Sequence, residues 1–175
     1  TVHQEIRIEV AHIPSRRAPH RSRDLRFDAT PKPEVRPPAI GFLLGASSVP
    51  DDVLPRIKAL QPAFLRCEAT PATLDAQLAQ VIKTAEPLGA IPEVVLRGAT
   101  TTLPRIAQRD PRSRFVLLDS DGNSVAEEVL HAWIDCCGAS RIGTGTAQHF
   151  AEFNRKPPPS GPDYAFAEFG INAQV

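Results

Sequence analysis

The chain has 175 residues, 42% of them hydrophobic, and its 20 basic and 20 acidic side chains give a formal net charge of zero at pH 7. That length and composition predict one soluble globular domain, and the balanced charge excludes the long-range field that draws a protein to nucleic acid or to an anionic membrane. No apolar stretch approaches the roughly 20 residues of a membrane helix, so we expect no membrane partner, and the balanced charge predicts no nucleic-acid partner. The three cysteines form no even disulfide framework, which favours a reducing compartment, so we expect a cytoplasmic protein.

The first 38 residues divide into two segments of different composition. Residues 1–14 contain an alternation of apolar and polar side chains, which is the two-residue period of a half-buried strand. Because a lone strand needs partners, we interpret this segment as the terminal strand of a preceding β-domain. Residues 15–38 are rich in arginine and proline, a composition typical of an extended, solvated linker. Residues 39–175 are then predicted to form the main domain.

Six short apolar runs recur about every 25 residues in this domain, and each is followed by a segment with helical spacing of its apolar side chains; they are residues 38–45, 63–68, 91–97, 114–119, 141–146 and 164–171. This rhythm predicts an α/β fold, a partial TIM-type (β/α) barrel with about six parallel strands and its last quarter missing. The alternative is an open, doubly wound sheet, in which the strand order reverses midway. The unpaired edges of an incomplete barrel would favour self-association.

Several helix boundaries can be predicted from local signals. Pro55 and Pro104 lie in two near-identical Leu-Pro-Arg-Ile segments, and proline is tolerated in the first turn of a helix, so both predict helix starts. Residues 73–87 carry an apolar stripe typical of a long amphipathic helix. Ser124 and Glu127 have the spacing of a capping box at the start of a further helix.

Polar side chains gather at the predicted carboxyl ends of the strands, where the groups that act on substrate stand in a parallel barrel. These candidates are Arg66, Glu68, Arg97, Asp119, His149, Glu152, Asn154, Asn172 and Gln174. Arg66 and Glu68 are two residues apart, so both side chains project from the same face of their strand. Two interpretations of this pair stay open: a structural ion pair inside the barrel mouth, or two groups that flank a ligand.

No metal or other cofactor is expected. His149 and Glu152 could share a helix face, but no second histidine lies at another strand end. The turn that begins at Asp119 resembles a calcium loop, yet Gly122 falls at the fourth rather than the sixth position, and Leu130 stands where the bidentate glutamate should be. Turn formation explains this segment, which leaves Asp119 as a single site candidate.

Two segments resemble the D-apionate lactonase family. Residues 143–155 contain a glycine-threonine stretch followed by Phe150, Glu152, Asn154 and Arg155, and residues 171–175 read INAQV. Members of that family carry a glycine-threonine stretch, a Phe-x-Glu-Leu-Asn-Arg segment and an Ile-Asn-Pro-Gln-Val-His segment. The run Leu-Arg-Cys-Glu that ends at residue 68 is similar to a Leu-Arg-Val-Asp run of the family. The likeness spans nearly the whole chain.

The resemblance implies a β-domain followed by a TIM-type barrel that hydrolyses a sugar-acid lactone, D-apionolactone, to the open acid. Such a reaction needs a base that activates water, donors for the tetrahedral oxyanion and polar contacts to sugar hydroxyls. By this resemblance Glu152 or Glu68 would be the base or orienting group, and Arg66 the oxyanion or carboxylate partner. The substrate-binding candidates would be Asn154, His149, Asn172, Gln174 and Asp119. Hydrogen bonding at a helix start stays open as a structural role for Glu152 and Asn154.

Two other functional interpretations stay open. A glycosidase-like barrel would use paired carboxylates across a glycosidic bond, with Glu68, Asp119, Glu152 and Glu168 as candidates. Alternatively, the chain is an inactive truncated remnant or a binding module. Acid release from aldonolactones, beside cleavage of chromogenic glycosides, separates these functions.

Overall fold

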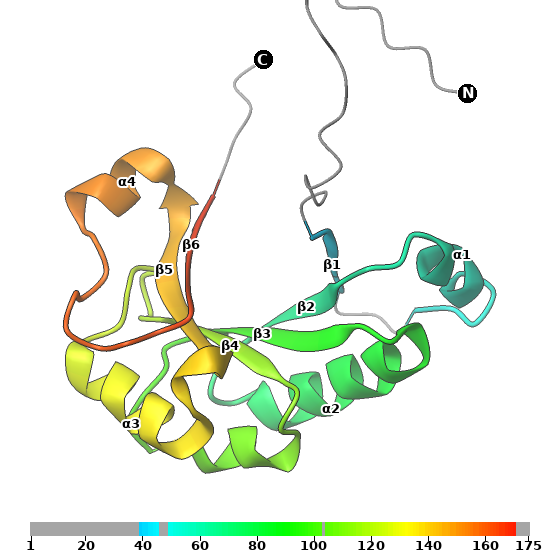
Figure 1. Ribbon diagram of the computed structural model, residues 1–175, viewed down its shortest axis with the longest axis horizontal. Helices are drawn as coiled ribbons and strands as arrows, with labels where there is room; N and C mark the ends of the chain where they lie inside the picture. The colour runs from blue at the N-terminus through cyan, green and yellow to red at the C-terminus, as the bar shows by residue number, and fades with distance from the viewer. Residues whose placement is uncertain (1–38, 46–48, 103, 171–175) are drawn as a thin grey trace, which may run out of the picture. The chain divides into compact units, whose positions relative to one another are not determined.

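A computed structural model describes residues 39–45, 49–102 and 104–170. Their centre is a six-stranded sheet in the order β1-β2-β3-β4-β5-β6, with every neighbouring pair parallel (Figure 1). The strands are β1 (Gly41–Leu43), β2 (Phe64–Ala69), β3 (Ile91–Arg97), β4 (Arg114–Leu118), β5 (Ile142–His149) and β6 (Phe166–Gly170). The sheet curls into a half-barrel, and its sequential order confirms the partial TIM-type barrel over the doubly wound alternative. The predicted strand in residues 1–14, the linker of residues 15–38, Asn172 and Gln174 lie outside the described residues.

Short helices connect the strands. They are α1 (Leu54–Ala59), α2 (Leu74–Ala85), α3 (Glu127–Cys137) and α4 (Phe150–Arg155), with 3-10 turns at η1 (Glu86–Leu88), η2 (Pro104–Arg109) and η3 (Ala139–Arg141). The helices α2 and α3 lie along one side of the sheet, whereas α4 stands at the end of β5 (Figure 1). The opposite, concave face of the curled sheet carries no helix in the described part of the chain.

The main core fills the space between the sheet and the helices α2 and α3. Alternate strand side chains face the helices because successive residues of a strand point to opposite sides. Fully buried members of this core include Leu65, Leu96, Phe115, Leu117, Leu74, Leu78, Val81, Leu130 and Trp133. Each buried leucine stabilises the fold by about 1.5–3 kcal/mol. The indole Nε1 of Trp133 donates to the Thr100 carbonyl at 2.9 Å, so the largest core side chain has its polar atom satisfied.

The predicted helix boundaries have mixed outcomes. Pro55 lies in the first turn of α1, as predicted, whereas Pro104 begins the 3-10 turn η2 and not an α-helix. The predicted helix at residues 73–87 is α2, with Thr73 at its N-cap position. The capping box is wrong: Ala126 is the N-cap of α3, and the Ser124 hydroxyl donates to the Gly145 carbonyl at 2.9 Å. Ser124 is instead held to the sheet, because a bridge pairs it with β4.

Two phenylalanine rings on the concave face lie over glycines of the preceding strand. Phe64 is the register partner of Gly41, and Phe166 is the register partner of Gly143. A Cβ atom at either glycine would overlap the facing ring. The guanidinium of Arg114 lies 4.2 Å from the centroid of the Phe166 ring, so the ring also covers a charged group. The glycines therefore let both ends of the half-barrel seat an aromatic side chain on the concave face.

We expect Gly145→Ala to weaken the pairing of β5 with β6. A Cβ atom at this position would overlap the backbone carbonyl of Glu168, its register partner, and backbone cannot rotate away as a side chain can. The free energy of unfolding should fall by about 1–3 kcal/mol, the usual cost of overpacking, as measured by urea denaturation. Gly45→Ala is the matched control, because nothing lies within 4 Å of a Cβ there. Equal stabilities of the two variants would contradict this account of β5 and β6.

Candidate functional site

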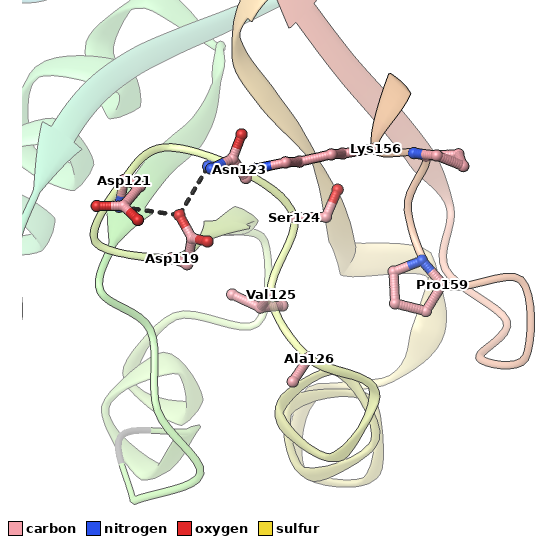
Figure 2. Close-up of a pocket in the computed structure, with 9 residues that line it drawn as sticks. Asp119, Asp121, Asn123, Ser124, Val125, Ala126, Lys156 and Pro159 are labelled. Carbon is pink, nitrogen blue, oxygen red and sulfur yellow. Dashed lines mark hydrogen bonds between the residues drawn. The ribbon is translucent and has the colours of Figure 1, made fainter. Parts of the chain in front are cut away.

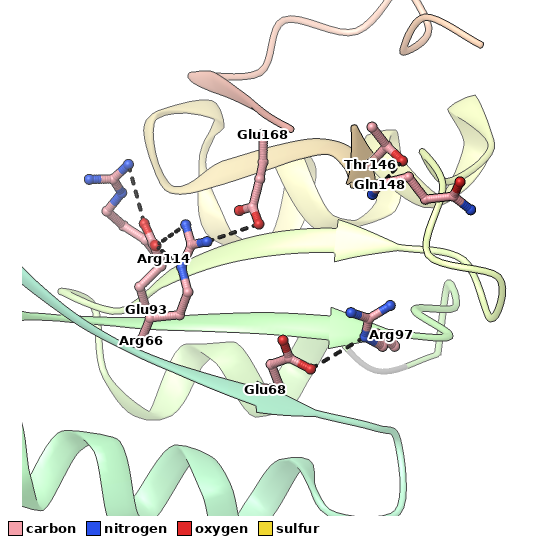
Figure 3. A network of polar contacts seen from close by, with 8 residues as sticks. All are labelled: Arg66, Glu68, Glu93, Arg97, Arg114, Thr146, Gln148 and Glu168. Carbon is pink, nitrogen blue, oxygen red and sulfur yellow. Dashed lines mark hydrogen bonds and ion pairs between the residues drawn. The ribbon is translucent and has the colours of Figure 1, made fainter. Parts of the chain in front are cut away.

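Six charged side chains gather on the concave face of the sheet (Figure 3). They are Arg66 and Glu68 of β2, Glu93 and Arg97 of β3, Arg114 of β4 and Glu168 of β6. Three positive and three negative charges balance, so the face is polar without a net charge. Glu68 and Arg97 lie at the carboxyl ends of their strands, which is the end where barrel enzymes hold their substrates, whereas Glu93 and Arg114 lie in the amino-terminal halves of β3 and β4.

Strand register brings the centre of this cluster together. Arg66 is the register partner of Glu93, and Glu93 is the register partner of Arg114. In a parallel sheet, register partners project from the same face. A positive, a negative and a positive side chain therefore stand side by side across β2, β3 and β4.

Glu93 is the hub of this row. Its side chain is only 2% exposed, and its Oε1 accepts a hydrogen bond from Nε of Arg66 at 2.8 Å and forms an ion pair with Nη2 of the same guanidinium at 2.6 Å. Nη2 of Arg114 lies 3.5 Å from the other oxygen, Oε2. A buried carboxylate requires such partners, because an uncompensated charge in the interior is very costly.

Glu168 reaches Arg66 from the far strand of the half-barrel. Nη1 of Arg66 lies 2.8 Å from Glu168 Oε1, whereas Oε2 of Glu168 is buried without a hydrogen-bond partner among the described residues. Burial raises the pKa of Glu168; Arg66 opposes this shift, and the charges of Glu93 and Glu68 reinforce it. For Arg66, burial lowers the pKa, but the adjacent Glu93 and Glu168 carboxylates together raise it above its ordinary value.

The raised pKa of Glu168 predicts a specific pH dependence of stability. Below the ordinary glutamate pKa of about 4.3, Glu168 is protonated in both the folded and the unfolded chain, and its contribution to stability is fully present. As the pH rises through the raised folded-state pKa, the folded chain must ionise a buried carboxyl, so that contribution is lost. We therefore expect Glu168→Gln to gain stability relative to the wild type as the pH increases from 4 to 8.

Urea denaturation at several pH values measures this difference. The exposed Glu128→Gln is the control and should follow the wild type across the same range. A Glu168→Gln difference that is independent of pH, or that reverses in sign, would contradict the assigned environment of Glu168.

Glu68 and Arg97 form a second, more open pair at the carboxyl ends of β2 and β3. Nε of Arg97 lies 3.4 Å from Glu68 Oε2, and the two side chains are 35% and 53% exposed. With Thr70 and Thr73 they line a pocket of about 110 Å³. Arg66 and Glu68 do share a face, as predicted, but each pairs with a residue of another strand. Glu68 is the carboxylate that solvent and a ligand can reach.

Asp119 lies in a separate, larger pocket of about 500 Å³ beyond the end of β4 (Figure 2). Asp121, Asn123 and Lys156 also line it. Oδ1 of Asp119 accepts hydrogen bonds from the backbone N–H groups of Asp121 and Asn123 at 2.9 and 2.7 Å. Asp119 therefore shapes its turn, as predicted, and only its other oxygen is left to face a ligand.

The remaining candidates lie around α4. His149 is the last residue of β5, Glu152 and Asn154 are on α4, and His149 and Asn154 are exposed. Glu152 forms a close ion pair with Arg155 of the same helix. In the described part of the chain no ion pair joins Glu152 to Arg66. The structure thus brings Arg66 and Glu68 together in one charged cluster and leaves Glu152 in another setting.

Two members of the cluster, Glu93 and Arg114, were missed by the sequence predictions. The signal for Glu93 was available, because a glutamate inside the apolar run of residues 91–97 has to be paired if it is buried. Arg114, at the start of the next apolar run, was the candidate partner. Glu168 was considered only for a glycosidase, since its distance from Arg66 in sequence gave no reason to join them.

Within residues 39–45, 49–102 and 104–170, no group of three or more His, Cys, Asp or Glu side chains is arranged to hold a metal ion. No helix in those segments combines the length and the apolar character needed to cross a membrane. Comparisons of the chain with known protein families, with curated proteins and with solved structures found no match.

Proposed function

We propose that this half-barrel belongs to a hydrolase that opens a sugar-acid lactone, D-apionolactone, to the free acid, as the resemblance to the D-apionate lactonase family implies. The observation that carries the proposal is the Glu68–Arg97 pair, an accessible carboxylate beside an accessible guanidinium at the carboxyl ends of two neighbouring strands. A base next to a fixed cation is the minimum that lactone hydrolysis requires.

In the proposed reaction, ionised Glu68 accepts a proton from water while the water oxygen bonds to the lactone carbonyl carbon. The guanidinium of Arg97 stabilises the negative charge that develops on the carbonyl oxygen. The ring C–O bond then breaks, and the leaving ring oxygen takes the proton from Glu68. The product acid loses its own proton to solvent, so turnover releases acid.

The other candidates have supporting roles in this proposal. Arg66 forms ion pairs with Glu93 and Glu168, so in this proposal it orients the neighbouring carboxylates. It contacts the substrate directly only if a ligand displaces one of these carboxylates. His149, Asn154 and Asp119 are the candidate contacts to sugar hydroxyls. Glu152 stays the alternative base, although its partner Arg155 would have to release it.

A glycoside hydrolase is the second candidate function, and one observation favours it. Glu68 and Glu168 both project from the concave face, and the charge of Glu68 contributes to the raised pKa of Glu168. Two carboxylates in unequal environments are the arrangement that separates a general acid from a base or nucleophile.

The test is a pH-stat assay of acid release from D-apionolactone and other aldonolactones, run beside a panel of chromogenic glycosides. Acid release above the buffer rate, without glycoside cleavage, supports the lactonase. Glycoside cleavage alone overturns it in favour of the second candidate. No acid release and no glycoside cleavage would contradict both enzyme functions and would favour a binding module or an inactive remnant.

Cytoplasmic localisation and self-association belong to the same proposal. Cys67, Cys136 and Cys137 form no disulfide, which suits a reducing compartment. In the described part of the chain, β1 and β6 are the two edge strands of the sheet, and each has one neighbouring strand. Light scattering that shows a monomer at all concentrations would contradict self-association through these edges.

A further inference from the structure

Arg66 holds its two carboxylate partners in different ways. Glu93 is buried, accepts a hydrogen bond from Nε, forms an ion pair with Nη2 and also lies close to Arg114. Glu168 meets only Nη1, through one of its two oxygens. We infer that the concave face contains a binding site for a small hydroxycarboxylate, in which Glu168 occupies the place of the ligand's carboxylate at Arg66 and leaves it on protonation.

The geometry of the Arg66 guanidinium suits the exchange of Glu168 for a ligand carboxylate. Arginine presents a planar fork of N–H donors that matches a carboxylate, and the contacts to Glu93 fix the plane of this fork. The Arg66 side chain is 26% exposed, so the Nη1 side is open to solvent once Glu168 withdraws. Glu93 alone does not neutralise Arg66 and Arg114, so the row without ionised Glu168 has an excess positive charge.

Glu168 is the partner that a ligand can replace, because only one of its two carboxylate oxygens has a polar partner among the described residues. Its Oε2 is buried without a partner among the described residues, and it belongs to the edge strand β6. The charged groups around it are Arg66 and Glu68 on β2, Glu93 on β3 and Arg114 on β4, with Arg97 paired to Glu68. Burial disfavours its ionised form, and the charges of Glu93 and Glu68 disfavour it further.

A second unsatisfied group indicates the class of ligand. Nε of Arg114 is buried without a partner among the described residues, and the Phe166 ring covers the guanidinium. A buried N–H donor without an acceptor costs free energy, which an oxygen of a bound molecule can recover. A small hydroxycarboxylate supplies a carboxylate for Arg66 and, from a nearby hydroxyl oxygen, an acceptor for Nε of Arg114. This inference goes beyond lactone hydrolysis and does not depend on it, although an open sugar acid belongs to the same class.

Binding of D-gluconate, measured by isothermal titration calorimetry at pH 7.5, tests the exchange. We expect Glu168→Ala to bind at least about tenfold more tightly than the wild type, since one competing charge-assisted contact is removed. The double variant Glu168→Ala, Arg66→Met should lose that gain, and the control Glu128→Ala should bind like the wild type. Equal affinity of Glu168→Ala and the wild type, or a gain that survives loss of Arg66, would overturn the inference.

A second measurement uses the wild-type chain and covers the case in which the variants do not fold. Methanesulfonate keeps its charge between pH 5 and 8, so any change in its affinity reports on the protein. We expect its affinity to increase as the pH is lowered, because protonation of Glu168 releases Arg66. Affinity that does not change with pH overturns the exchange. Both readouts are binding constants, so they stand whether or not the chain hydrolyses lactones.

Discussion

Glu93→Gln should lower the free energy of unfolding by about 3–5 kcal/mol, the cost of breaking a buried ion pair by removing one partner. Glu93 is 2% exposed and is the shared carboxylate of Arg66 and Arg114. Without its charge, Arg66 on β2 keeps Glu168 as an anionic partner, whereas Arg114 on β4 loses the carboxylate that it faces on β3. Urea denaturation followed by far-UV circular dichroism measures the change.

Glu128→Gln is the matched control, because that glutamate is exposed on α3, and its stability should differ little from the wild type. A loss below about 1 kcal/mol at Glu93 would show that Arg66 and Arg114 find water or other partners readily. That result would contradict the view that the row of Arg66, Glu93 and Arg114 across β2, β3 and β4 stabilises the fold.

Glu68→Gln should reduce kcat/KM for D-apionolactone by about 10²–10⁴-fold, the usual contribution of a general base. Glutamine keeps the shape of the side chain but cannot accept the proton from water. Because Glu68 is 53% exposed, the substitution should leave the fold unchanged. The pH-stat assay measures the loss.

The exposed Glu86→Gln, in the η1 turn before the amino end of β3, is the matched control and should retain normal turnover. Glu152→Gln distinguishes the alternative base. Normal turnover of Glu68→Gln together with a large loss in Glu152→Gln would move the base to α4 and reduce the Glu68–Arg97 pair to a structural role.

The order of the strands could be predicted from sequence because it depends on local signals. Apolar runs such as residues 91–97 and 114–119, separated by helical spacing, predict strands that alternate with helices, and short connections make successive parallel strands neighbours. The predicted helix of residues 73–87 succeeded for the same reason, since Leu74, Leu78 and Val81 mark one buried face. Pro104 also begins a helical segment, although a proline in the first turn does not decide between a 3-10 and an α-helix, and η2 is a 3-10 helix.

The charged cluster could be predicted only in part. Parity within one strand puts Arg66 and Glu68 on the same face, but the partner of each depends on the register between strands and on how far the sheet curls. Arg66 and Glu168 are far apart in sequence, and only the curvature of the half-barrel brings them within 2.8 Å. Ser124 shows the same limit, because its hydroxyl bonds a carbonyl of β5 and not the helix that follows it.

The most direct test of the central claim, that the charged concave face is where this chain meets its ligand, is a backbone ¹⁵N NMR titration with D-apionate, the product of the proposed reaction. We expect the amide signals that shift to belong to the carboxyl halves of β2, β3 and β6, around Glu68, Arg97 and Glu168. Shifts confined to the pocket of Asp119 and Lys156, or to α4, would contradict it, as would a spectrum that does not change.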